Sequence, residues 1–254
     1  MGLSALALCF LAAGLCLPSE WTSLGSLSQV SVLRRAATLR AVYGFHPYCG
    51  RHICRGVLIH PQWVLTAAHC CSWFPRGHSP TVALGAHSLS KNEPMKQTFK
   101  IKRLVPFSKS PASHDIMLVK LHTSAELNKH VQLLQPRSKN YIRDGTKCQV
   151  TGWGVPSPDL LKPSDTLQEV TVSAISRKRC NSQSCYNQNP VITRDMMDSC
   201  QGDSGGPLVC KGVFHAIVSG GHKCGIANKP GIYTLLTKKY QSWIKSKLAP
   251  SSAN

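Results

Sequence analysis

The sequence predicts an all-β fold, and two observations carry this prediction. Short apolar or β-branched runs recur at intervals of roughly ten residues, and Gly, Pro, Asn and Ser separate them. This spacing is typical of a β-sandwich or a β-barrel. Helical patterns also do not alternate with the runs, which disfavours a parallel sheet built from strand–helix–strand units.

Eight runs carry the strand prediction, and one helix is expected at the end of the chain. The runs lie at residues 57–59, 63–65, 81–84, 116–119, 170–172, 208–209, 213–218 and 232–236. The helix is indicated by Tyr240, Trp243, Ile244 and Leu248, which recur at helical spacing with lysines between them. We expect this apolar stripe to pack against the β core.

The composition indicates a globular protein that contains disulfides. The chain has 254 residues, of which 42% are hydrophobic and 16% charged, enough for one large domain or two packed halves. Twelve cysteines are too many for an ordinary reduced cytosolic enzyme. They form no CxxC pair that would indicate a zinc site, so disulfides are the better interpretation.

The N-terminal region predicts entry into the secretory pathway. Residues 3–17 are an almost unbroken apolar run that ends at Pro18. Its length suits the core of a signal peptide and is short for a membrane span, so we expect residues 1–17 to be a signal peptide. No later stretch is long and apolar enough to cross a bilayer. The prediction is therefore a secreted or granule protein without a membrane span.

The charge is strongly positive and leaves two interpretations open. Thirty Lys and Arg residues face eleven acidic residues, for a formal charge of +19, with clusters at 100–103, 177–179 and 238–239. Each cluster is either a solvated surface or an attraction for polyanions, such as sulfated glycans or acidic proteins. Nucleic acid is disfavoured as a partner, because no basic motif is interleaved with aromatic residues.

Three segments contain residues suited to nucleophilic catalysis. Ser204 lies within Gly-Asp-Ser-Gly-Gly-Pro at 202–207, where small neighbours suit a tight turn with backbone N–H groups facing an oxyanion. A serine hydroxyl needs a histidine to accept its proton, and His69 follows a run of small residues. The imidazole needs a carboxylate to fix its tautomer, and Asp115 precedes the apolar run 116–119.

The segments around these three residues, in this order, resemble those of the chymotrypsin-family (trypsin-like) serine peptidases. Longer stretches at 82–93, 115–121 and 229–236 resemble the granzymes of that family. The resemblance implies two six-stranded antiparallel β-barrels with the active site between them. It places a peptidase domain at about 26–249, with barrels at about 29–137 and 138–238 and a C-terminal helix at 238–248.

The same resemblance implies the role of each site residue. His69 would be the general base, Asp115 its orienting partner and Ser204 the nucleophile. The backbone N–H groups of Gly202 and Ser204 would form the oxyanion hole. The chemistry would pass through an acyl-enzyme and need no metal or cofactor.

The resemblance also implies a substrate preference. Asp198 matches the acid at the base of the primary specificity pocket, where a carboxylate favours a Lys or Arg side chain of a protein or peptide substrate. Gly221 and Gly231 match the small pocket walls. Ser219 matches the residue that begins the substrate-binding strand.

The cysteines follow the family only in part. The resemblance implies the disulfides Cys54–Cys70, Cys148–Cys210 and Cys200–Cys224. Cys180 matches a cysteine whose partner is absent from this chain. Cys49, Cys71 and Cys185 have no expected partners.

Two departures from the family bear on activity. In family zymogens, cleavage frees an N-terminus that begins with Ile or Val, a hydrophobic residue and two glycines. Its ammonium pairs with the acid that matches Asp203 and orders the pocket. This chain contains no such sequence. A buried Asp203 without a counter-charge would pay for its desolvation, and the nearby loops would reorganise.

The second departure is a gap before the specificity pocket. Met196 and Met197 run directly into Asp198, so the chain is about nine or ten residues shorter than the family pattern. We expect the lost strand to expose an edge of the second barrel. Arg55 is a smaller departure, because relatives have a glycine there, beside the oxyanion region.

Two functional interpretations follow. The first is a trypsin-like endopeptidase that cleaves after Lys or Arg. The alternative is an impaired family member or incomplete isoform that acts at most as a basic binding protein. The ordered motifs around His69, Asp115 and Ser204 argue against an unrelated glycan-binding module.

Overall fold

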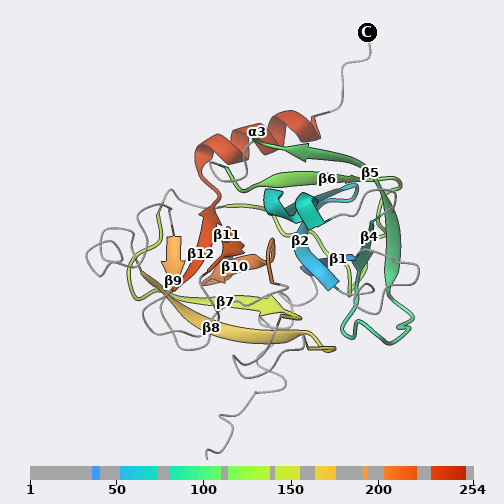
Figure 1. Ribbon diagram of the computed structural model, residues 1–254, viewed down its shortest axis with the longest axis horizontal. Helices are drawn as coiled ribbons and strands as arrows, with labels where there is room; N and C mark the ends of the chain where they lie inside the picture. Colours follow the sequence, from blue (N-terminus) through green and yellow to red (C-terminus); the bar gives the residue numbers. More distant parts are fainter. Residues whose placement is uncertain are drawn as a thin grey trace, which may run out of the picture.

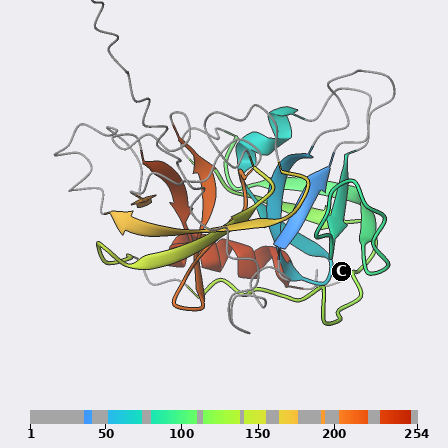
Figure 2. The same ribbon diagram turned by 90° about the horizontal axis from the view of Figure 1, so that it is seen from below.

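The computed structural model describes residues 36–40, 52–73, 80–109, 114–137, 141–154, 164–175, 191–193, 203–221 and 230–249. Within these ranges, the strands form two closed antiparallel β-barrels that lie side by side, followed by a C-terminal helix (Figure 1). In Figure 2 the blue-to-green strands of the first barrel and the yellow-to-red strands of the second occupy opposite halves of the molecule. The expected fold class is confirmed.

The first barrel has the strand order β1-β2-β3-β6-β5-β4 and closes through pairing of β1 with β4. Its strands are β1 (Ala36–Arg40), β2 (His52–His60), β3 (Trp63–Thr66), β4 (Thr81–Leu84), β5 (Gln97–Pro106) and β6 (Met117–Leu121). Buried apolar side chains, among them Leu58, Val82 and Val119, form one core cluster from these strands. A short 3-10 helix, η1 (Ala68–Trp73), follows β3.

The second barrel has the order β10-β11-β12-β9-β8-β7 and closes through pairing of β10 with β7. Its strands are β7 (Lys147–Gly152), β8 (Gln168–Ile175), β9 (Val191–Thr193), β10 (Pro207–Cys210), β11 (Val213–Gly220) and β12 (Gly231–Leu235). Its interior contains a separate buried cluster that includes Val150, Ala216 and Tyr233.

The expectation that the gap before Asp198 opens the second barrel is wrong. β9 (Val191–Thr193) pairs with β12 on one side and with β8 on the other, so the sheet is continuous at this point. The Val-Ile-Thr sequence of β9 has high β propensity, because branched side chains suit a pleated strand. A short segment upstream of the gap thus occupies the strand position.

A third core cluster joins the two barrels to the C-terminal helix. It combines Leu65 of β3, Ile217 of β11 and Ile244 of α3 (Lys238–Leu248). Phe107, which follows β5, contacts the rings of Tyr240 and Trp243 with centroid distances of 5.0 and 5.2 Å. The helix that follows the second barrel therefore packs on the first.

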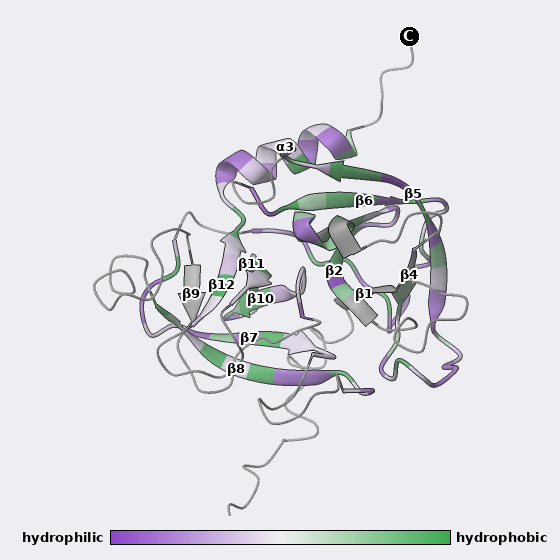
Figure 3. Cartoon of the chain, viewed as in Figure 1, coloured by the Kyte–Doolittle hydropathy of each residue, from purple (hydrophilic) through white to green (hydrophobic). Residues whose placement is uncertain are grey.

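The apolar stripe predicted for the helix is confirmed. Ile244 is buried, and Tyr240, Trp243 and Leu248 are partly buried against the joining cluster. The lysines between them give α3 its purple segments in Figure 3. Among the described residues, no helix is long and apolar enough to cross a membrane.

Two disulfides are present in the described part of the chain. Cys54–Cys70 joins β2 to η1, and Cys148–Cys210 joins β7 to β10. Cross-links of this kind contribute roughly 2–4 kcal/mol each by restricting the unfolded chain. Cys71 carries a free, partly exposed thiol. The expected Cys200–Cys224 bond, the other unmatched cysteines and residues 1–17 lie outside the described residues.

Candidate active site

His69 and Asp115 come together because β3 and β6 pair in antiparallel fashion. Thr66 of β3 lies opposite Met117 of β6. His69 lies three residues after Thr66, and Asp115 lies two residues before Met117. In an antiparallel pair the end of one strand meets the start of the other, so residues 46 apart in sequence become neighbours.

The two side chains make a direct contact with a defined orientation. His69 Nδ1 lies 2.8 Å from Asp115 Oδ2, and the backbone N–H of His69 donates to Asp115 Oδ1 at 2.9 Å. The His69 side chain is 29% exposed and that of Asp115 is 11% exposed. The imidazole therefore keeps access to solvent while the carboxylate behind it is largely buried.

The carboxylate of Asp115 is held by further groups from the second barrel. The hydroxyl of Ser219, at the end of β11, donates to Asp115 Oδ2 at 2.5 Å. The hydroxyl of Thr234 in β12 donates to the backbone carbonyl of Asp115 at 3.1 Å. Both contacts link the two barrels, so the relative position of the barrels fixes the position of Asp115.

These contacts keep Asp115 ionised. Burial raises the pKa of Asp115, but hydrogen bonds from His69 and Ser219 and the attraction of the imidazolium lower it. The net effect is a pKa below the ordinary value of an aspartate. At neutral pH the group is a carboxylate, which favours the His69 tautomer that carries its proton on Nδ1.

Ser204 lies in a turn that glycines permit. Gly205 has φ +83°, in the left-handed region that glycine adopts without strain. A Cβ on Gly205 would also overlap the Thr66 hydroxyl and the carbonyl of Arg55. The N–H of Gly206 donates to the Asp203 carbonyl at 2.9 Å, which closes the turn.

The same turn is attached to both barrels. The N–H of Gly205 donates to the Val218 carbonyl at 2.7 Å, and the N–H of Val218 donates to the Gly206 carbonyl at 2.8 Å. On the other side, the N–H of Arg55 donates to the carbonyl of Ser204 at 2.7 Å. That carbonyl lies 4.0 Å from the sulfur of Cys70, the residue after His69. The Ser204 turn thus lies against the segment that carries His69.

Asp203 is buried, with 8% of its surface exposed, and has partners. Its Oδ1 accepts the backbone N–H of Gly154 at 3.0 Å. A Cβ on Gly152 or Gly154 would overlap the carboxylate, so these glycines make room for it. The carboxylate therefore has a hydrogen-bond donor and a fitted space in the described part of the structure.

The remaining predicted site residues fall into two groups. Ser219 and Gly231 lie in β11 and β12, and Gly221 directly follows β11 with its backbone exposed. Gly231 is buried and pairs with Thr193 of β9. Gly202 and Asp198 lie outside the described residues.

Sequence reasoning missed two contacts at this site. It assigned Ser219 to substrate binding and did not predict its hydrogen bond to Asp115. The second contact is the hydrogen bond from Arg55 to Thr151. From the sequence Arg55 is only a minor departure, whereas in the structure it is completely buried beside the Ser204 turn. Neither contact leaves a local signal, because the partners are far apart in sequence.

One cluster has the residue types of a metal site but not its chemistry. Single ligand atoms of Cys54, His69 and Cys70 lie within 4.8 Å of one another. The two cysteines form a disulfide, which has no thiolate to offer a metal. Only His69 would remain as a ligand, so this cluster is not a metal site.

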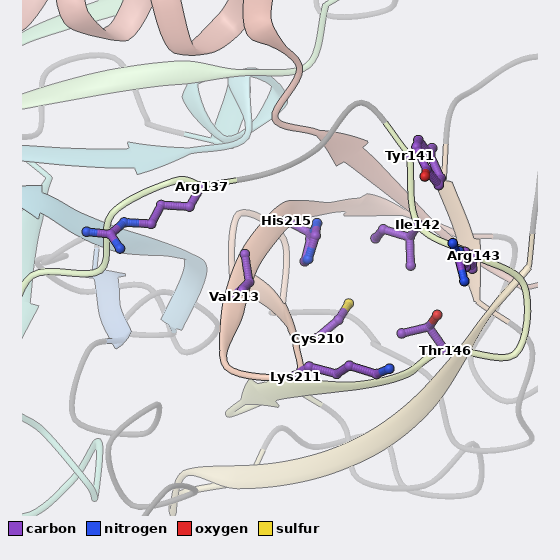
Figure 4. Close-up of a pocket in the computed structure, with 9 residues that line it drawn as sticks. All are labelled: Arg137, Tyr141, Ile142, Arg143, Thr146, Cys210, Lys211, Val213 and His215. Atoms are coloured by element: carbon purple, nitrogen blue, oxygen red, sulfur yellow. The ribbon is translucent and has the colours of Figure 1, made fainter.

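A cavity of about 320 Å³ lies at the opposite end of β10 from Ser204. Its lining combines apolar and basic residues: Arg137, Tyr141, Ile142, Arg143, Thr146, Cys210, Lys211, Val213 and His215. Figure 4 shows the amino group of Lys211 directed toward Thr146 and the guanidinium of Arg137 directed away from the hollow. None of the described residues that line it is acidic.

The fold and the site together define a class. Two antiparallel barrels, a buried carboxylate behind a solvent-accessible imidazole, and an adjacent Gly-Asp-Ser-Gly-Gly turn are the architecture of a two-barrel serine peptidase. The family model described as Trypsin matches residues 31–244 of the chain. The chain belongs to the trypsin family of serine proteases.

Three relatives show how the similarity is distributed. Granzyme A of Bos taurus is 44% identical over 213 residues, covering 79% of this chain and 81% of the relative. Hepatocyte growth factor activator serine proteases of Canis lupus familiaris are 35% identical over 235 residues. The corresponding protein of Mus musculus is 35% identical over 234 residues. The last two matches span 82% of this chain but only 36% and 35% of the length of those relatives.

Proposed function

We propose that the chain is a trypsin-like serine endopeptidase that cleaves proteins after Lys or Arg. The observation that carries the proposal is the His69–Asp115 pair, supported from the second barrel by Ser219 and adjoined by the Ser204 turn. An imidazole held by a buried carboxylate has one use in this setting, which is to accept a proton from a nucleophile.

The proposed reaction begins with the attack of Ser204 Oγ on the carbonyl carbon of the scissile bond, while His69 Nε2 takes the hydroxyl proton. The carbonyl oxygen becomes an oxyanion that the N–H groups of Ser204 and Gly202 would stabilise. Collapse of this intermediate expels the amine, which receives the proton from His69. Water then attacks the acyl-enzyme by the same route and restores Ser204.

Preference for Lys or Arg is assigned to Asp198, with Gly221 and Gly231 as the small walls of the pocket. A carboxylate at the base of a narrow pocket attracts a cationic side chain and disfavours neutral ones. Replacing Asp198 by serine should lower kcat/KM for Lys and Arg esters by about 10²-fold or more, because the substrate cation loses its counter-charge.

The measurement compares benzoyl-arginine and benzoyl-phenylalanine ethyl esters on the two proteins. The matched control is labelling of Ser204 by a small alkyl fluorophosphonate, which has no basic side chain and should react equally with both. Equal loss on all three reagents would show that Asp198 supports the fold rather than specificity. If the wild-type chain is not labelled, the alternative of an impaired family member holds.

We also propose secretion or granule storage. The apolar segment 3–17, the two disulfides and the similarity to granzyme A support it. N-terminal sequencing of the protein recovered from the medium of expressing cells tests it. Retention of residues 1–17 in a cytosolic product would contradict it.

Anionic glycans are the proposed second class of partner, and the basic cavity at the end of β10 is the specific observation that favours them. Replacing Arg143 by serine and Lys211 by asparagine should lower the salt concentration that elutes the protein from heparin. Asparagine suits position 211, where φ is +51°. The control removes two exposed lysines of α3, Lys245 and Lys247. Equal shifts in both double variants would mean that only net charge matters.

A further inference from the structure

Arg55 is the most unusual buried group in the described part of the molecule. It lies in β2 with 0% of its surface exposed, where it is among the largest fully buried side chains. Its Nη2 donates to the Thr151 hydroxyl at 3.0 Å, and its Cζ lies 5.3 Å from the centroid of the Trp153 ring. Its Nε and Nη1 make no hydrogen bond within the part of the chain that the structure describes.

The guanidinium lies beside the turn that carries Ser204. A Cβ on Gly206 would lie 2.6 Å from Arg55 Nη1 and 3.0 Å from the carbonyl oxygen of Asp203. Thr151 and Trp153, which contact the guanidinium, flank Gly152, against which the Asp203 carboxylate packs. The cation and the carboxylate therefore occupy one buried region between β2, the end of β7 and the Ser204 turn.

Two opposing effects act on the pKa of Arg55 in this region. Burial lowers the pKa of Arg55 to about 10, while the charge of Asp203 raises it. The guanidinium therefore stays protonated at neutral pH and attracts Asp203. Because burial is the larger effect, the charged side chain costs folding stability instead of adding to it. A change at Arg55 can thus alter the site without unfolding the protein.

We propose that Arg55 is a positioning residue for Ser204. Its guanidinium provides an internal positive charge that attracts the Asp203 carboxylate across the buried region that they share, and its backbone N–H donates to the Ser204 carbonyl. The turn is then fixed from inside the first barrel by a residue of the same chain. The inference rests on the proposed function in that Ser204 is taken as the nucleophile.

A space-filling role for Arg55 makes a different prediction. A side chain that only fills volume would be replaced well by methionine, which is apolar and of similar length. A side chain that positions Asp203 by charge would be replaced better by lysine. The two roles are distinguished by comparing Arg55→Met and Arg55→Lys, with Arg103→Met as the control that removes an exposed arginine of β5.

The first experiment measures fluorophosphonate labelling of Ser204 together with kcat and KM for an arginine ester. Arg55→Met should lower the labelling rate and kcat at least about tenfold, with KM within about threefold of wild type, because the turn and not the pocket is disturbed. Its unfolding equilibrium constant in urea should change less than tenfold. Arg55→Lys should recover most of the labelling rate. Full activity of Arg55→Met would overturn the proposal and leave the proposed function intact.

The second experiment does not require turnover. Urea unfolding of Arg55→Met, Asp203→Asn and the double variant forms a double-mutant cycle. We expect a coupling of at least tenfold in the unfolding equilibrium constant, which is about 1.4 kcal/mol. If the wild-type chain is not labelled at Ser204, the proposed function fails while a tenfold coupling still supports the charge interaction. A coupling near onefold overturns the charge interaction between Arg55 and Asp203, whether or not Ser204 is labelled.

Discussion

Replacement of Ser204 by alanine is expected to reduce hydrolysis of arginine esters by about 10⁶-fold in kcat, as loss of the nucleophile does in serine peptidases. The hydroxyl is the group proposed to form the acyl-enzyme, and no neighbouring side chain in the Gly-Asp-Ser-Gly-Gly turn can replace it. The measurement is the initial rate on a benzoyl-arginine ester together with fluorophosphonate labelling, which should disappear.

The fold should tolerate this change, so loss of activity can be separated from loss of structure. The turn is held by the backbone groups of Ser204, Gly205 and Gly206, which alanine at position 204 leaves in place. We expect stability to change by no more than about 0.5 kcal/mol. Ser246→Ala, which removes an exposed hydroxyl of α3, is the matched control and should keep full activity. More than a hundredth of wild-type activity in Ser204→Ala would contradict the assignment.

The strands that could be predicted from the sequence are those that contain a continuous apolar or β-branched run. All eight apolar runs coincide with strands, as in β3, where each residue is buried. Four strands were missed: β1, β5, β7 and β9. β5 shows why, because its Lys and Arg side chains face solvent and only Phe99 is fully buried. A strand with one exposed face and little apolar content has no periodic signal strong enough to stand out.

The gap before Asp198 illustrates a second limit of sequence reasoning. A missing segment does not by itself predict a missing strand, because strand positions in a barrel are set by pairing and can be filled by neighbouring residues. The β-branched residues of β9 were available to pair with β8 and β12. The length of a segment therefore predicts less about the closure of a barrel than its β propensity does.

At the site, local motifs predict which residues are the candidates, whereas the contacts that hold their side chains depend on the tertiary structure. His69, Asp115 and Ser204 lie in recognisable local sequences, so each could be named before the fold was known. The Ser219–Asp115 hydrogen bond joins residues 104 apart, and the Arg55–Thr151 bond joins residues 96 apart. Such contacts depend on how the two barrels pack, which no local pattern in one sequence encodes.

Replacement of Asp115 by asparagine should lower kcat by about 10⁴-fold, the size of effect known for the carboxylate of such triads. Asparagine keeps the shape of the side chain but would present an amide to His69 Nδ1 at a contact now 2.8 Å long. The imidazole then favours the tautomer with its proton on Nε2 and can no longer accept the proton of Ser204. The pH–rate profile on an arginine ester measures this loss.

The same substitution has a pH-dependent effect on stability that does not depend on catalysis. The pKa of Asp115 in the folded state lies below its ordinary value, because the hydrogen bonds from His69 and Ser219 outweigh the opposing effect of burial. The carboxylate therefore adds stability above the unfolded-state pKa, and this contribution disappears as the pH falls through the lower folded-state pKa. Urea unfolding should show wild type more stable than Asp115→Asn at pH 7, with the difference shrinking below about pH 4. A difference that stays constant across this range would mean that Asp115 contributes by packing, and that the short contact with His69 is not a charge-assisted hydrogen bond.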